Sequence, residues 1–281
     1  MIFLALALFA AIPTQDPPKA EIGWSLKSGQ QVRYEMEKTT RIHMKEGTIE
    51  MKLTLGLVLE AGEGDGKGST GLKVTIDRVG MSGKGDKDAE DYDSDRDKVE
   101  PKHPSIRLMA GCLNTKFEAK ISNRGALSDF RGLKEALEKS AQNVPEIKAM
   151  GDTGVGARFA DSIDQFMQEG FTLAPGSALA QGATWDSTPG KVLFGSGEAP
   201  LKIKSTVKEL RAGEAVISRT MELDFSKDER NPDGKGSGTG EVIWSTERGI
   251  PLSGQWRLHV ATARGASDVL FSLKLAPREK K

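Results

Sequence analysis

The chain has 281 residues, of which 37% are hydrophobic and 28% charged, so it can bury a core in one large or two smaller domains. Lysine plus arginine equals aspartate plus glutamate at 40 each, and this zero net charge excludes a chain-wide field that attracts nucleic acid or an anionic membrane surface. The 32 glycines and 12 prolines are typical of a chain with many hairpin turns.

The chain begins with an apolar segment that predicts export. Residues 2–12 form an unbroken apolar run, and Pro13, Pro17 and Pro18 end any helix there. A helix of this length spans roughly 17 Å, less than the ~30 Å hydrocarbon core of a bilayer. Residues 1–18 are therefore interpreted as a secretory signal peptide that lacks the usual basic start, with a buried N-terminal strand or helix as the alternative.

The clearest periodicity in the first half of the chain is two. Apolar side chains fall on even positions in residues 31–45 and on odd positions in residues 49–59, with the turn-like sequence KEGT between them. These runs predict a long β-hairpin with one buried and one wet face. The glycine-rich residues 61–71 are interpreted as the next hairpin connection, and further strands are predicted at 72–76 and 117–121.

An acidic stretch, residues 85–100, is the most pointed candidate site. The alternation of Asp91, Asp93 and Asp95 imitates the first three ligands of a calcium loop. The helix–loop–helix signature also needs a glycine and a later glutamate, but Arg96 and Lys102 occupy those two loop positions. The signature therefore fails. The preferred interpretation is a solvated acidic loop between strands, and the alternative is an irregular calcium site at the three aspartates.

Two segments in the middle of the chain have the periodicity of helices. Residues 127–141 place large apolar side chains on one face, with Ser128 or Asp129 as the N-cap. Residues 157–170 carry an apolar stripe that ends at Gly170. We expect both stripes to pack against a sheet.

The second half of the chain repeats the alternating pattern. Further strands are predicted around 201–207, 221–225, 242–244, 256–260 and 269–275, with the glycine-rich residues 231–240 as a loop. Trp24 and Trp185 each lie five residues before a glycine, which suggests two related halves. The predicted fold class is α+β and mainly antiparallel β. Residues 19–170 and 171–281 would be two β-rich halves of long meandering strands, with two or more helices packed against the sheets.

Short motifs around the tryptophans resemble those of a known family. They are WSLKSGQQVRY at residues 24–34, GATWD at 182–186 and TGEVIWSTERGIPLSG at 239–254. Over most of the mature chain they resemble an uncharacterised family of exported bacterial envelope proteins, a domain of unknown function. The resemblance implies that Gly125 follows a strand and precedes the Phe130 helix, and it implies no activity. Lipid-modified members have a cysteine after the signal, which this chain lacks.

Signatures of catalysis and cofactor binding fail in this sequence, so no cofactor is expected. The glycine-rich stretches lack the spacing of phosphate-binding and dinucleotide loops, and no serine lies in a G-x-S-x-G elbow. The three histidines have no partner at zinc-ligand spacing, and Cys112 is interpreted as a small buried side chain. The four tryptophans are interpreted as core or sheet-edge anchors, with a carbohydrate-lining role as the alternative.

Three functions remain open for a soluble protein that we expect to be exported, periplasmic or extracellular. The first choice is a non-catalytic binding or scaffold module for another envelope protein or a surface polymer. The second is a carrier that holds an apolar ligand or lipid between a curved sheet and the helices around Leu137 and Phe166. The third is a hydrolase with a dispersed carboxylate site, but no residue can be nominated, so the prediction leans away from an enzyme. Neither a nucleic-acid partner nor a membrane span in the mature chain is expected.

Overall fold

The computed structural model describes residues 18–45, 47–85, 91–149, 154–171, 174–194, 197–225, 233–263 and 265–277. Within these ranges the side chains of residues 189–194 and 197–198 are not described. The apolar segment that predicts export lies outside the described residues, as do residues 86–90 of the acidic stretch.

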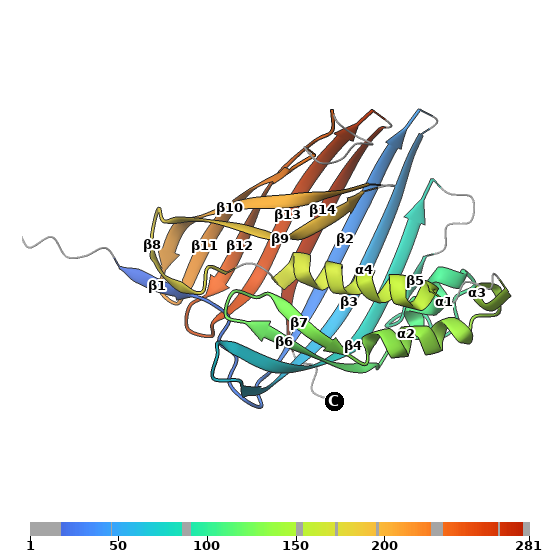
Figure 1. Ribbon diagram of the computed structural model, residues 1–281, viewed down its shortest axis with the longest axis horizontal. Helices are drawn as coiled ribbons and strands as arrows, with labels where there is room; N and C mark the ends of the chain where they lie inside the picture. Colours follow the sequence, from blue (N-terminus) through green and yellow to red (C-terminus); the bar gives the residue numbers. More distant parts are fainter. Residues whose placement is uncertain are drawn as a thin grey trace, which may run out of the picture.

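The described residues form one large antiparallel sheet with helices on one face (Figure 1). Its twelve strands are β2 (Gln31–Met44), β3 (Gly47–Gly64), β4 (Ser69–Lys84), β5 (Tyr92–Asp93), β6 (Lys116–Ser122), β7 (Leu127–Arg131), β9 (Thr184–Phe194), β10 (Gly197–Arg211), β11 (Glu214–Leu223), β12 (Lys235–Ser245), β13 (Ile250–Thr262) and β14 (Gly265–Ala276). Two short strands pair separately, β1 (Lys19–Ile22) and β8 (Ser177–Ala180). The helices are α1 (Pro104–Ala110), α2 (Leu133–Gln142), α3 (Pro145–Ala149) and α4 (Val155–Phe171).

Strands that are adjacent in the sheet are mostly adjacent in the chain. The order is β7–β6–β4–β3–β2–β14–β13–β12–β11–β10–β9, with β5 paired to β4. The strands before α4 and those after β8 form two blocks, which meet where β2 pairs with β14. This arrangement confirms the predicted α+β, mainly antiparallel fold class. The division of the chain at residue 170 stays a prediction, and both blocks belong to the same sheet.

The predicted long hairpin is confirmed as β2 and β3. The two strands pair from Gln31 opposite Glu60 to Met44 opposite Gly47. Alternate side chains of β2 point to one face, and two of them, Tyr34 and Met36, are fully buried. We call this the inner face of the sheet, and the opposite one the outer face.

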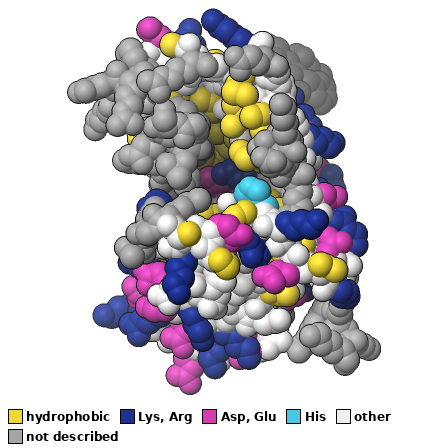
Figure 2. Space-filling model, turned by 90° about the vertical axis from the view of Figure 1, so that its right-hand side faces the viewer, with side chains coloured by type: hydrophobic (Ala, Val, Ile, Leu, Met, Phe, Trp, Pro, Cys, Tyr) yellow, Lys and Arg dark blue, Asp and Glu magenta, His cyan; other side chains and the backbone are white. Residues whose placement is uncertain are grey.

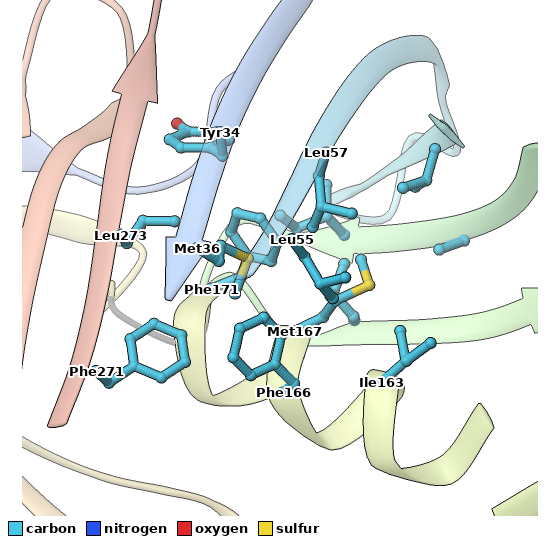
Figure 3. Close-up of a cluster of buried hydrophobic side chains, with 14 of the residues drawn as sticks. Tyr34, Met36, Leu55, Leu57, Ile163, Phe166, Met167, Phe171, Phe271 and Leu273 are labelled. Atoms are coloured by element: carbon cyan, nitrogen blue, oxygen red, sulfur yellow. The ribbon is translucent and has the colours of Figure 1, made fainter. Parts of the chain in front are cut away.

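Helix α4 lies across the inner face and supplies much of the core (Figures 1 and 3). In Figure 3 its side chains Phe166 and Met167 point toward Met36 and Leu55 on the strands. The rings of Phe166 and Phe271 have their centroids 5.2 Å apart. The predicted apolar stripe of this helix is therefore confirmed as sheet-facing core.

The predicted helix at 127–141 is wrong in its first part. Residues Leu127–Arg131 form β7, which pairs with β6, and α2 begins only at Leu133. Phe130 stacks on Phe117 with ring centroids 6.1 Å apart, so the edge of the sheet supplies the contacts that the helix was expected to supply. Gly125, expected from the family resemblance to precede a helix, is accordingly followed by this strand.

The predicted loop at 231–240 is also wrong. Most of the described part of this segment is a strand. Strand β12 begins at Lys235, so Gly236, Gly238 and Gly240 lie within it on the inner face. A Cβ atom on Gly240 would lie 2.8 Å from the Gln255 carbonyl oxygen. Glycine is needed here because the neighbouring strand comes close. In the sequence, the resulting glycine-rich stretch has the composition of a loop.

The tryptophan interpretation is confirmed, because Trp24, Trp244 and Trp256 are at most 7% exposed. The fourth, Trp185, lies on the edge strand β9 and packs against the core. The indole N–H of Trp24 donates a hydrogen bond of 3.0 Å to the Phe171 carbonyl oxygen at the end of α4. Its ring meets those of Phe171 and Trp244 edge to face. This aromatic cluster joins the segment after β1 to both blocks of the sheet.

Candidate functional site

The inner face continues beyond α4, where the upper ends of β13, β14, β2 and β3 extend past the helix in Figure 1. By alternation and register, Met44 and Met51 lie on this face. They are 44% and 41% exposed, whereas Met36 and Leu55, which pack against the helix, are fully buried. We call this region the upper patch. Met44 and Met51 are its exposed members, and Ile42, Ile49, Leu53 and Met81 are its partly buried ones.

Hydrophobic side chains also gather in the upper part of the molecule, as Figure 2 shows. Lower down, the inner face is filled by the side chains of α4, as Figure 3 shows. Leu137 and Phe166, around which the carrier hypothesis places its ligand, are both buried. The exposed apolar surface lies beyond the helix.

An ion pair lies at the boundary between the buried core and the upper patch. Lys38 Nζ lies 2.8 and 3.0 Å from the two carboxylate oxygens of Glu169 on α4. The side chains are only 20% and 10% exposed. Lys38 is on the inner face because it shares the alternation of Met36. The pair therefore ties the helix to β2 at the edge of the covered region.

A buried cation lies on the inner face of the second block. Arg219 of β11 is 2% exposed, and its guanidinium lies 5.6 Å from the centre of the Trp256 ring. Trp256 stacks on Phe271 with 4.3 Å between ring centroids. Burial lowers the pKa of Arg219 to about 10, which leaves the side chain charged near neutral pH.

The outer face carries a polar cavity of about 580 Å³ over β2, β3, β4 and β14, within the ~300–1,000 Å³ range of small-molecule sites. We call it the outer pocket. Its charged lining has four acidic and four basic side chains: Glu35, Glu37, Asp91, Asp93, Lys52, Arg78, Arg96 and Lys274. Three hydroxyl side chains also line it: Thr54, Ser82 and Ser272.

The segment around β5 forms one wall of the outer pocket and is held firmly. Arg78 donates two hydrogen bonds to the Asp93 carboxylate, of 2.6 and 3.2 Å. These bonds lower the pKa of Asp93, against an opposing effect of burial. The backbone N–H of Ser94 donates to the Val79 carbonyl oxygen at 2.9 Å, and the Ser94 hydroxyl accepts from the Val79 N–H at 2.9 Å. The wall is therefore fixed to β4 at several points.

The three aspartates predicted to bind calcium lie in this wall, next to arginines. Asp93 and Asp95 have carboxylate oxygens 2.6 and 3.3 Å from Arg78 nitrogens, and an Asp91 oxygen lies 3.4 Å from Arg96 Nη1. Within the described ranges, no three His, Cys, Asp or Glu side chains are grouped so that they could hold a metal ion. The calcium site stays a prediction, and a cation there would compete with both arginines.

Sequence reasoning missed a charged cluster on the outer face of β2, β13 and β14. Asp268 accepts contacts from His259 Nδ1 at 2.9 Å, His43 Nε2 at 3.0 Å and Arg257 Nη2 at 3.2 Å. Hydrogen bonds hold the pKa of Asp268 well below its usual range. The bond from His259 has the largest effect, burial opposes it, and the bonds from His43 and Arg257 add to it. The period-two pattern correctly placed both histidines on the wet face. Their shared partner depends on a pairing between distant strands, which no local spacing reveals.

Another hollow lies on β9–β12, with a volume of about 940 Å³. Its lining includes Lys202, Lys204, Glu222 and Lys235, which the structure shows as exposed. Lys202 pairs with Asp224 at 2.8 Å. Among the residues that the structure describes, no segment forms a wall here of the kind that β5 gives the outer pocket.

No helix in the part of the chain that the structure describes has the length and apolar character needed to cross a membrane.

Two solved structures are distantly similar to the chain. The crystal structure of the beta domain of the Bordetella autotransporter Brka is 8% identical, with 87% of this chain and 98% of that chain covered and a TM-score of 0.34. A DUF1329 family protein from Desulfovibrio piger ATCC 29098 is 8% identical, with 88% and 86% covered and a TM-score of 0.18. Both scores are too low to carry an argument about fold or function. No curated protein matches the chain.

A family model does match, over residues 67–251. This span runs from the turn before β4 into β13 and so includes the wall of the outer pocket, all four helices and most of the second block. The match covers more than half of the chain, and it bears out the resemblance to an uncharacterised domain. The chain belongs to the family of unknown function DUF6263.

Proposed function

We propose that this protein is an exported, non-catalytic binding protein that carries an apolar ligand on the inner face of its sheet. The observation that carries the proposal is the exposure of Met44 and Met51, on the same face whose covered part is fully buried core. Contiguous apolar surface that stays exposed on a folded protein is typical of a binding site. The ligand would lie along the upper patch, next to the end of the covered region marked by Lys38 and Glu169.

The side chains of the upper patch support a ligand of variable shape. Three of its six members are methionines: Met44, Met51 and Met81. Methionine has an unbranched, polarizable side chain that adapts to different apolar partners. The patch is continuous with the core through Leu53, which packs against it. A ligand chain that covers the patch would therefore extend the core instead of opening it.

Export remains part of the proposal on the strength of the sequence. The apolar residues 2–12, followed by prolines, are typical of a secretory signal. An apolar ligand would need such a carrier in an aqueous envelope compartment, because its exposed hydrocarbon surface is unfavourable in water.

A fluorescent apolar probe tests the proposal. N-phenyl-1-naphthylamine should bind the purified protein saturably, and Met51→Gln should weaken binding by about tenfold, since burying a methionine contributes about 1.5–3 kcal/mol when complete. Lys52→Gln is the matched control, because Lys52 is the next residue but lies on the outer face. Absence of saturable binding, or an equal loss in both variants, would refute the carrier proposal.

Protein purified from its own envelope gives a second readout. Native mass spectrometry followed by organic extraction should detect a retained apolar molecule. A clean apo mass, together with capture of a defined protein partner, would favour the scaffold function instead.

The hydrolase hypothesis has less support from the geometry. A general acid needs a carboxyl group with a raised pKa. The Asp93 carboxylate of the outer pocket has a lowered pKa, because Arg78 hydrogen-bonds to it. Glu37, which also lines this pocket, forms an ion pair of 2.6 Å with Lys52.

A further inference from the structure

The outer pocket lies on the face opposite the upper patch, so its role is independent of the carrier function. We propose that it binds a neutral saccharide unit, either free or as part of a surface polymer. Three properties of the described residues lead to this ligand class: the balance of charge, the fixed wall and the hydroxyl groups that have no partner of their own.

The balance of charge argues for a ligand without net charge. The lining has equal numbers of acidic and basic side chains, and several of them form ion pairs with one another. Arg78 pairs with Asp93 at 2.6 Å, and Lys52 pairs with Glu37 at 2.6 Å. An anion or a cation would have to break such a pair, and it would gain little from a pocket whose charges cancel. A neutral hydroxyl group can donate to a carboxylate and accept from a guanidinium without breaking it.

The fixed wall argues for a formed site. Among the charged side chains that line the pocket, Arg78 and Asp93 are the least exposed, at 24% and 22%, whereas Asp91 and Arg96 at the rim are 68% and 55% exposed. The pocket therefore has an ordered floor below an open rim. A site that is already ordered loses less conformational entropy when it binds a ligand.

The hydroxyl groups supply the remaining hydrogen-bonding capacity. The side chains of Thr54, Ser82 and Ser272 make no hydrogen bond with any residue that the structure describes, although all three line the pocket. They come from β3, β4 and β14, so they surround the floor on more than one side. Each can donate one hydrogen bond and accept others, which matches the paired donor and acceptor character of sugar hydroxyls.

Saturation-transfer difference NMR and calorimetry with neutral trisaccharides test the proposal. Maltotriose, cellotriose and chitotriose are the probes, and at least one should bind. Thr54→Val and Ser272→Ala should each weaken that binding by about fivefold, since each removes one hydrogen bond of about 1 kcal/mol and keeps the charge network intact. Thr75→Val is the matched control, because Thr75 lies on β4 beyond the pocket.

Two further arms make the outcome decisive. Glutamate, lysine and glucuronate are the charged competitors, and they should not displace the bound trisaccharide. Thermal unfolding should show that the pocket variants are folded like the parent protein. No binding of any neutral probe, displacement by a charged competitor, or an equal loss in Thr75→Val would overturn the proposal. Binding of N-phenyl-1-naphthylamine should be unchanged by the pocket variants, so this proposal and the carrier proposal fail separately.

Discussion

Replacing Gly240 with alanine should destabilise the protein, although alanine is the better residue in most strands. A Cβ atom on Gly240 would lie 2.8 Å from the Gln255 carbonyl oxygen and 3.0 Å from Trp256 Cα. Ordinary Cβ contacts begin at 3.4 Å, so β12 and β13 would have to separate by about half an ångström. Both clashing groups are backbone or next to it, and they cannot rotate away.

The expected cost follows from two opposing effects. Overpacking of a well-packed interior costs typically about 1–3 kcal/mol, and the removal of a glycine from a strand returns roughly 0.5–1 kcal/mol. We expect a net loss of about 1–2 kcal/mol. Urea unfolding followed by tryptophan fluorescence measures it as a lower midpoint at an unchanged slope.

Gly71→Ala is the matched control for this prediction. Gly71 also lies within a strand, β4, but the nearest atom to its added Cβ would be the Glu63 carbonyl oxygen at 3.7 Å. This variant should be neutral or slightly more stable. The reasoning would be refuted if Gly240→Ala unfolds at the parent midpoint, or if both variants lose the same stability.

Three other predictions follow from buried or paired groups. Trp24→Phe removes the indole hydrogen bond to the buried Phe171 carbonyl and should lower the unfolding free energy by about 1–3 kcal/mol in urea; an unchanged midpoint would contradict it. Burial raises the pKa of Cys112 to about 12, so the native thiol should not react with Ellman's reagent at pH 8 but should react fully in urea. The hydrogen bond from Arg96 lowers the pKa of Asp97 to about 2; this pair therefore stabilises the fold above about pH 4, and the contribution is lost as the pH falls toward 2. In Arg96→Gln the unfolding free energy should depend less on pH in this acidic range, and an unchanged pH dependence would contradict the pairing.

Much of the fold could be predicted from the sequence because alternation is a local property. Residues 31–45 and 49–59 show which side chains point inward without any knowledge of their neighbours, and the structure agrees. The stripe that ends at Gly170 is equally local, because a helix places residues three and four apart on one face.

The errors came from contacts between distant segments. The sequence pattern predicts that Phe130 belongs to a helix. In the structure its ring packs on Phe117 of β6, and the segment joins the sheet as β7. Gly236, Gly238 and Gly240 read as a loop, because the need for close approach to β11 and β13 is invisible in composition. Propensity is a weak guide where such packing decides.

The candidate sites were the least predictable part. Asp91, Asp93 and Asp95 were correctly singled out as an unusual cluster, but their partner Arg78 lies on another strand. The upper patch could not be recognised either. Its methionines have the same alternation as the core, and only the length of α4 relative to the strands decides which of them are covered.

The pairing of β2 with β14 has a consequence for how the chain reaches its native state. Tyr34 pairs with Leu275, which lies far along the chain, so the central seam of the sheet can close only after β14 has been synthesised. Pairings of such large sequence separation fold slowly, because a long loop must close before the contact is formed. Until then the first block presents β2 as an open edge with an apolar face. Under the proposed export, β2 would stay unpaired until β14 is available. A sheet that closes this late is compatible with crossing a membrane in the unfolded state.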